Sequence, residues 1–116
     1  MKASERRDPD AEQDAEHRLY AAVMTLQTID EARDFFRDLC TPAELQAIAD
    51  RWRVVGLLRE KRPYREIHDL TGVSVTTIGR VARFLEFGNG GYRRAVERLE
   101  AAEQARRPAQ KRRARK

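Results

Sequence analysis

The spacing of apolar residues along the chain predicts a series of helices. Apolar side chains first recur at helical intervals in the segment that holds Leu19, Tyr20, Val23 and Met24. Residues 1–14 are polar and show no such periodicity, so we expect a disordered tail that fades into the first helix. No segment alternates apolar and polar residues for long enough to predict a strand, and the expected fold class is therefore all-α.

A capping box predicts the start of a second helix near Ile29. In this motif the first side chain accepts a hydrogen bond from the backbone N–H three residues later, and the later side chain reaches back to the first backbone N–H. Thr28 and Glu31 have the required types and spacing. The helix that follows places its apolar residues on one face; they are Ile29, Ala32, Phe35, Phe36 and Leu39.

A second box of the same kind precedes a longer helix. Thr41 and Glu44 form it, and Pro42 suits the first helical position, where its missing N–H costs nothing. This helix is predicted to run from Pro42 to about Glu60. Its buried stripe is expected to comprise Leu45, Ile48, Ala49, Trp52, Val55 and Leu58.

Residues 63–87 have the pattern of a helix-turn-helix. A short helix from Pro63 to Leu70 is followed by a turn at residues 71–73 and by a helix from Ser74, a good N-cap, to about Phe87. The apolar residues expected to lock the two helices together are Ile67, Leu70, Val73, Ile78, Val81 and Leu85. A glycine-rich segment, residues 88–91, then precedes a final helix marked by Tyr92, Ala95, Val96 and Leu99.

Length and composition fit one small helical domain. The chain has 116 residues, of which 37% are charged, and no apolar run is long enough to span a membrane. We expect a helical domain at residues 15–103 between the tail 1–14 and a basic tail at 104–116. The charged N-terminus predicts no secretory signal, and the single Cys40 suits a reducing compartment, so a cytoplasmic location is expected.

The charge changes sign along the chain. Residues 1–50 carry 6 Lys or Arg against 12 Asp or Glu, whereas residues 51–105 carry 11 against 7. Residues 106–116 add 7 basic residues and no acid. The C-terminal half is therefore the candidate surface for a polyanion, although a charge run can also be only a solvated face.

The helix predicted from Ser74 carries small groups and cations but no acid in its first turns. Threonine offers a hydroxyl to base edges and a methyl to thymine, and arginine pairs with guanine or phosphate. This helix is therefore predicted to enter the major groove of double-stranded DNA, with the C-terminal tail adding sequence-independent affinity. The predicted DNA-binding residues are Arg65, His68, Ser74, Val75, Thr76, Thr77, Gly79, Arg80, Arg83, Lys111, Arg112 and Arg113. His68 stands where many such units have a small residue, but it could equally face solvent or a phosphate.

Catalysis is not expected from this inventory of residues. His17 and His68 are far apart in the sequence, Cys40 stands alone, and the carboxylates fall mostly on solvated helical faces. No metal site is predicted. Two alternatives to a sequence-specific regulator stay open. One is an adaptor of the transcription machinery whose helix-turn-helix contacts protein, and the other is a nonspecific nucleic-acid binder that uses the basic tail.

The region from about residue 19 to residue 99 resembles the Trp-repressor-like family, and especially its YerC/YecD-type branch of small bacterial regulators. The most distinctive match is the block from Phe87 to Tyr92, because a helix-turn-helix does not in general require it. The other matching segments are residues 35–45, 49–52, 57–59, 64–67, 71–74 and 76–81. The resemblance implies a six-helix fold, an intertwined homodimer and a transcriptional regulator, most simply a repressor, that associates with the bacterial nucleoid when bound to DNA.

The resemblance also suggests an interface and an effector pocket. Leu19, Tyr20, Phe35 and Phe36 are the candidate dimer contacts, although the same residues would suit the core of a monomer. The family's corepressor pocket maps onto Thr41, Arg51 and Arg80, of which Thr41 and Arg51 also have structural explanations, as a cap and a surface cation. Val81 and Phe84 replace smaller residues there, so tryptophan binding is not expected; no other cofactor is predicted, and the sequence names no effector.

Overall fold

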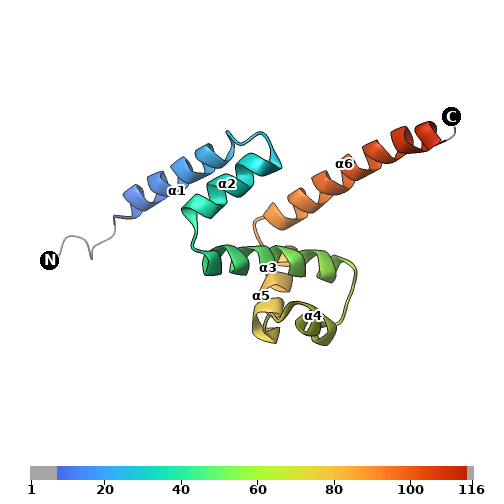
Figure 1. The fold of residues 1–116 in the computed structure, drawn as a ribbon. Helices are drawn as coiled ribbons and strands as arrows, with labels where there is room; N and C mark the ends of the chain where they lie inside the picture. Colours follow the sequence, from blue (N-terminus) through green and yellow to red (C-terminus); the bar gives the residue numbers. More distant parts are fainter. Residues whose placement is uncertain (1–7, 115–116) are drawn as a thin grey trace. The chain divides into compact units, whose positions relative to one another are not determined.

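The computed structural model describes residues 8–114 of the chain, with side chains described through residue 107, and this part contains six helices and no strand (Figure 1). The helices are α1 (Pro9–Val23), α2 (Ile29–Leu39), α3 (Pro42–Arg59), α4 (Tyr64–Thr71), α5 (Val75–Phe87) and α6 (Gly91–Ala114). The all-α, six-helix prediction is confirmed. The chain divides into two units, one ending at Leu45 and the other beginning at Gln46.

Helix α1 begins earlier than its apolar pattern predicts. The Asp8 side chain accepts a hydrogen bond from the Asp10 N–H at 3.0 Å, and Pro9 occupies the first turn. Asp10 and Glu12 also lie in the first turn, where acids interact favourably with the helix dipole. Residues 9–14, which we predicted within a disordered tail, are therefore helical. Capping and charge start this helix before its apolar stripe begins. The rest of that predicted tail, residues 1–7, lies outside the described residues.

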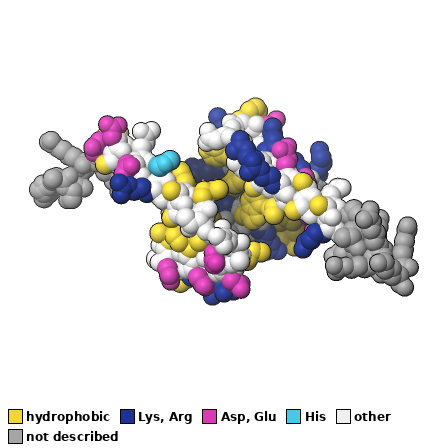
Figure 2. Space-filling view, turned by 90° about the horizontal axis from the view of Figure 1, so that it is seen from above, with side chains coloured by type: hydrophobic (Ala, Val, Ile, Leu, Met, Phe, Trp, Pro, Cys, Tyr) yellow, Lys and Arg dark blue, Asp and Glu magenta, His cyan; other side chains and the backbone are white. Residues whose placement is uncertain are grey.

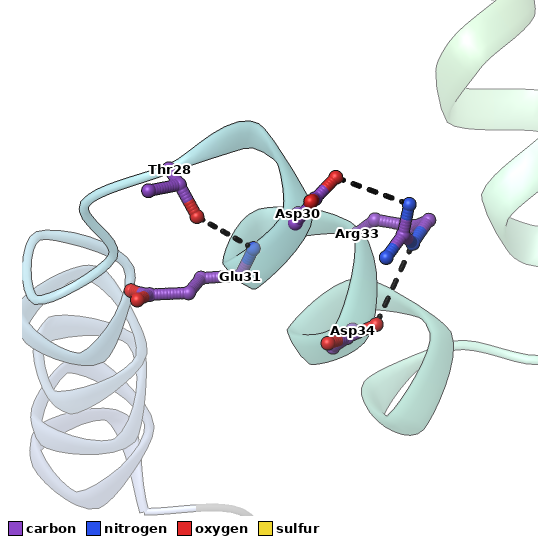
Figure 3. A network of polar contacts seen from close by, with 5 residues as sticks. All are labelled: Thr28, Asp30, Glu31, Arg33 and Asp34. Carbon is purple, nitrogen blue, oxygen red and sulfur yellow. Dashed lines mark hydrogen bonds and ion pairs between the residues drawn. The ribbon is translucent and has the colours of Figure 1, made fainter.

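The capping box at α2 forms with one change. The Thr28 hydroxyl accepts from the Glu31 N–H at 3.1 Å, as predicted, but the Glu31 carboxylate accepts from the Gln27 N–H at 3.0 Å. In Figure 3, Arg33 reaches toward Asp30 and Asp34 on the same helix, at N–O distances of 3.2 and 3.5 Å. The start of α2 is thus held by side chains of its own first turns.

The first unit buries very little of its apolar surface. Neither α1 nor α2 contains a buried residue. The exposed fractions are 54% for Tyr20, 81% for Met24, 87% for Ile29 and 52% for Leu39. Phe35 and Phe36 are half-buried and contact each other edge to face, with ring centroids 5.4 Å apart. These two helices therefore carry apolar surface that the described residues of the first unit leave open.

The capping box before α3 forms as predicted. The Glu44 carboxylate accepts from the Thr41 N–H at 2.8 Å, and the Thr41 hydroxyl accepts from the Glu44 N–H at 3.2 Å. The backbone hydrogen bond from Thr41, followed by the contact with its side chain, lowers the pKa of the Glu44 carboxyl from its usual value. The helix begins at Pro42 and ends at Arg59, one residue before the predicted end.

The core of the second unit is small and joins three helices. Its buried residues are Val54 and Val55 of α3, Ile67 of α4, and Ile78 and Val81 of α5. Around them pack the half-buried residues Leu57, Leu58, Val73, Leu85, Tyr92 and Val96.

The predicted buried stripe of α3 is partly wrong. Val55 is buried and Leu58 is half-buried, as expected, but Val54 is buried as well. Ile48 and Trp52 keep exposed fractions of 48% and 39%. The Trp52 ring lies 6.2 Å from the Tyr92 ring, centroid to centroid, and is not enclosed. Apolar spacing finds the apolar faces of this helix, but it does not tell which face the same chain covers.

The helix-turn-helix consists of α4 and α5. Ile67, Ile78 and Val81 lock it as predicted, whereas Leu70 is 47% exposed. Gly72 ends α4 in the left-handed conformation, with φ at 73°, and its N–H donates to the His68 carbonyl at 2.8 Å. This turn requires glycine or a similarly tolerant residue because other side chains adopt positive φ only at a cost.

Helix α6 continues past the predicted end of the domain at residue 103. It runs over 24 residues to Ala114, so the backbone of most of the predicted basic tail is helical. The segment after Leu99 lacks apolar periodicity but is rich in Ala, Glu, Gln and Arg, which are strong helix formers. Arg59 of α3 donates a hydrogen bond to Glu100 of α6 at 3.1 Å and so connects these two helices within the second unit. None of the helices described here is both long and apolar enough to cross a membrane.

Two glycines of the helix-turn-helix allow a matched test of this backbone. Gly72→Ala should lower the free energy of unfolding by about 1–2 kcal/mol, because alanine is strained at a φ of 73°. Gly79→Ala should raise it by about 0.8 kcal/mol, because Gly79 lies inside α5 and a Cβ there meets no atom within 4 Å. Urea denaturation at one protein concentration measures both, and equal shifts in the two variants would contradict the assignment of the turn.

Candidate nucleic-acid interface

Helix α5 begins at two hydrogen bonds between Ser74 and Thr77. The Ser74 hydroxyl accepts from the Thr77 N–H at 3.1 Å and donates its hydrogen to the Thr77 hydroxyl at 3.0 Å. Ser74 is therefore the N-cap, as predicted. The cap also orients the Thr77 side chain, which no pattern in the sequence indicates.

The structure separates two threonines that the sequence presents as equivalent. Thr77 is half-buried, and its hydroxyl already accepts the bond from Ser74. Thr76 is exposed and forms no side-chain hydrogen bond among the described residues. Val75 beside it is 53% exposed. The free side chains in the first turn of α5 are therefore those of Val75 and Thr76.

The helix-turn-helix carries three arginines without an ion pair among the described residues. Arg65 of α4 and Arg80 and Arg83 of α5 are exposed, and none forms an ion pair within the part of the chain that the structure describes. The first turn of α5 contains no acid. Gly79, also predicted to be in the interface, is half-buried and leaves open space above its backbone. The surface is thus positive and open to a polyanion.

His68 lies at the edge of the same surface. Its side chain is exposed, and its Nδ1 atom lies 2.8 Å from the Val73 carbonyl oxygen. It therefore does not occupy the tight space between the helices where a small residue is common. The predicted contacts Lys111, Arg112 and Arg113 belong to the backbone of α6, but their side chains lie outside the described residues.

A cavity of about 310 Å³ opens beside α5. Of the predicted pocket residues, it brings together Arg51 and Arg80. Thr41 belongs to the first unit, and its hydroxyl is used in the cap of α3. Val81 and Phe84, named as replacements for smaller residues, both line the cavity without filling it.

Two further residues of the cavity were not predicted. Thr77 turns toward it from the capped end of α5, and Tyr92 reaches it from the first turn of α6. The Tyr92 ring also packs against Trp52. The only signal in the sequence is the aromatic residue that follows the glycine-rich segment 88–91.

Apolar and basic side chains meet on the second unit. Figure 2 shows Lys and Arg side chains around an exposed hydrophobic surface next to α6. Phe84 and Phe87 are 57% and 76% exposed, and they share a cavity with Arg80 and Arg83. These four residues follow each other at helical intervals on one face of α5.

Comparison with known proteins identifies the family. The family model of the Trp repressor protein matches residues 15–100. YerC of Bacillus subtilis strain 168, a protein described as uncharacterized, is 40% identical over 85 residues, which are 73% of this chain and 82% of YerC.

Two solved structures share the fold. A TrpR-like protein from Eubacterium eligens ATCC 27750 has a TM-score of 0.71 and 45% identity, over 75% of this chain and 90% of the other. A candidate Trp repressor from Staphylococcus aureus has a TM-score of 0.71 and 32% identity, over 86% of this chain and 95% of the other. The chain therefore belongs to the Trp repressor family, which consists of DNA-binding regulators rather than enzymes.

Proposed function

We propose that this protein is a sequence-specific transcriptional regulator, a repressor in its simplest form, that inserts α5 into the major groove of DNA. The observation that carries the proposal is the exposed, acid-free first turn of α5 among three unpaired arginines. An α-helix with its side chains is about 10–12 Å wide, and the major groove of B-DNA is about 12 Å wide. The family assignment supports the same function.

The side chains divide the work of binding. Val75 and Thr76 are free to contact base edges, including the thymine methyl group. Arg65, Arg80 and Arg83 hold phosphates or guanine. Ser74 and Thr77 bind each other and set where the helix begins. The basic residues after 105 add affinity that depends on salt and not on sequence.

The regulator acts as a homodimer in the cytoplasm, associated with the bacterial nucleoid when bound to DNA. The support for a dimer is the open apolar surface of α1 and α2, which contain no buried residue. Surfaces of this kind mark interaction sites. Leu19, Tyr20, Phe35 and Phe36 then contact the second copy. Two α5 helices presented by a dimer read half-sites about 34–36 Å apart; the Trp repressor is itself an example of this geometry.

The cavity beside α5 suits an anion better than an amino acid. Arg51 and Arg80 line it, and none of the described residues brings a carboxylate to it. An ammonium group in this cavity would therefore meet positive charge and no acidic partner. Phe84 and Val81 add apolar walls, and the hydroxyls that reach the cavity come from Thr77 and Tyr92. Tryptophan is accordingly not a corepressor of this protein, and DNA binding requires no cofactor.

Selection of duplexes from a random pool at about 150 mM salt tests the proposed function, because nonspecific binding weakens there. The protein should enrich a near-palindrome. Thr76→Ala should cost about 1–3 kcal/mol of binding free energy on that duplex and little on a scrambled one. Thr77→Ala should lower the free energy of unfolding as well, because it removes the partner of Ser74.

A deletion of residues 106–116 is the control for nonspecific affinity. It should weaken binding to the enriched and scrambled duplexes by the same factor and reduce the dependence on salt. Binding without enrichment would leave the protein a nonspecific nucleic-acid binder. No DNA binding at all would favour an adaptor that contacts protein.

Sedimentation equilibrium tests the homodimer. The protein should sediment at twice the chain mass of 13.5 kDa. Phe36→Asp should shift it to the monomer, because a carboxylate would be buried without a partner in the interface. Arg37→Asp introduces the same charge at an exposed neighbouring position and should leave the dimer intact. Circular dichroism of both variants checks that α2 still forms; a monomeric wild-type protein would contradict the homodimer.

Calorimetric titration tests the absence of a tryptophan corepressor. We expect no heat of binding with tryptophan up to about 1 mM, which corresponds to a binding free energy weaker than about −4 kcal/mol. Phe84→Ser removes the ring from the cavity wall and adds a hydroxyl, so it is the variant most suited to gain binding. Micromolar binding of tryptophan by the wild-type protein would refute the proposal.

A further inference from the structure

Both backbone polar groups of Val73, its N–H and its carbonyl, are held by side chains of α4. Its N–H donates to the Thr71 hydroxyl at 3.1 Å, and its carbonyl oxygen lies 2.8 Å from Nδ1 of His68. The Thr71 hydroxyl in turn donates to the Ile67 carbonyl at 2.7 Å. Both side chains come from the last turn of α4, so the turn is fastened to the helix that precedes it.

The chemistry of this contact determines the state of the histidine ring. A carbonyl oxygen only accepts hydrogen bonds, so Nδ1 of His68 must carry the hydrogen. In the neutral ring the other nitrogen, Nε2, then has none. The Thr71 hydroxyl uses its single hydrogen on Ile67 and accepts from Val73, so its two roles are compatible.

Val73 lies just before α5, so the hydrogen bonds of its backbone with His68 and Thr71 affect how that helix begins. Val73 immediately precedes Ser74, the N-cap of α5. Gly72, on its other side, has a positive φ and restricts its own backbone least of all residues. The Val73 side chain is half-buried against the core, and this packing fixes its position. The two peptide groups on either side of Val73 are oriented by hydrogen bonds instead.

We propose that His68 is a positioning residue for DNA recognition. Thr71 holds the peptide group before Val73 and His68 the one after it, so together they fix the direction in which α5 leaves the turn. The proposal rests on the proposed function, because it concerns how α5 is presented to DNA. It assigns to His68 a role inside the protein in place of the direct DNA contact that the sequence predicts.

NMR tests the geometry without DNA. The ¹⁵N shifts of the His68 ring in the neutral state should identify the form with hydrogen on Nδ1. In His68→Ala, exchange of the Thr77 amide hydrogen should become several-fold faster, whereas exchange in α6 should not change. An Nε2–H ring, or unchanged exchange at Thr77, would overturn the proposal whether or not the protein binds DNA.

Binding measurements test the consequence for recognition. The probes are the duplex enriched by selection and a scrambled duplex of the same composition. His68→Ala should weaken binding to the enriched duplex by about 3- to 10-fold, in line with the loss of one hydrogen bond, and leave the scrambled duplex within about twofold. His68→Asn should restore binding, because its side-chain amide places an N–H at the same number of bonds from the backbone.

Two comparisons separate positioning from other roles. His17→Ala, which removes the other histidine, should leave the affinity for both duplexes unchanged. The proposal would fail if His68→Ala weakened binding to both duplexes equally and His68→Asn did not restore it. His68 would then be a direct phosphate contact or a merely stabilising residue. If selection enriched no duplex, the proposed function would fail, while the NMR result would still decide the state of His68.

Discussion

The second unit depends on the packing of five side chains that are all β-branched. Val54, Val55, Ile67, Ile78 and Val81 are the buried residues of the described chain. In a helix, valine and isoleucine each have one strongly preferred side-chain rotamer, so they lose little freedom on packing and fit together in few ways. A core this small can hold α3, α4 and α5 in one arrangement because its components are stiff.

That core does not extend to every apolar residue of the chain. Helices α1 and α2 have strong caps and a clear apolar face, yet they bury no residue. Local interactions thus specify the helices of the first unit, whereas the described residues of that unit bury no side chain of α1 or α2. Helices of this length are marginal without tertiary packing. Under the proposed homodimer, assembly and folding of this unit are one process.

The fold could be predicted from the sequence where local chemistry determines it. The starts of α2, α3 and α5 follow from Thr28, Thr41 and Ser74, whose hydroxyls accept from backbone N–H groups three residues later. The first turns of α1 and the last turns of α6 escaped prediction because they lack an apolar face. Capping, charge and helix propensity form them, and these signals are weaker than periodicity.

The candidate site was predictable in its residue types but not in its geometry. The acid-free turn of α5 and its arginines could be read directly from the chain. The exposure of Trp52 and the position of Tyr92 in the cavity depend on how distant elements pack. The bond from His68 to Val73 is local, but it depends on the exact geometry of the turn, which residue types alone do not give. Apolar spacing cannot distinguish a face covered by the same chain from one left open, and so the predicted burial of Ile48 and Trp52 was wrong.

The bond between Ser74 and Thr77 has a consequence for how DNA specificity can change over evolution. Ser74 and Thr77, which start α5, are hydrogen-bonded to each other. Their neighbours Val75 and Thr76 are exposed, and neither side chain forms a hydrogen bond among the described residues. Under the proposed function, substitutions at these two free positions would alter the preferred operator with little loss of stability. Paralogues built on this scaffold can therefore diverge in the genes they control while the helix-turn-helix itself stays unchanged.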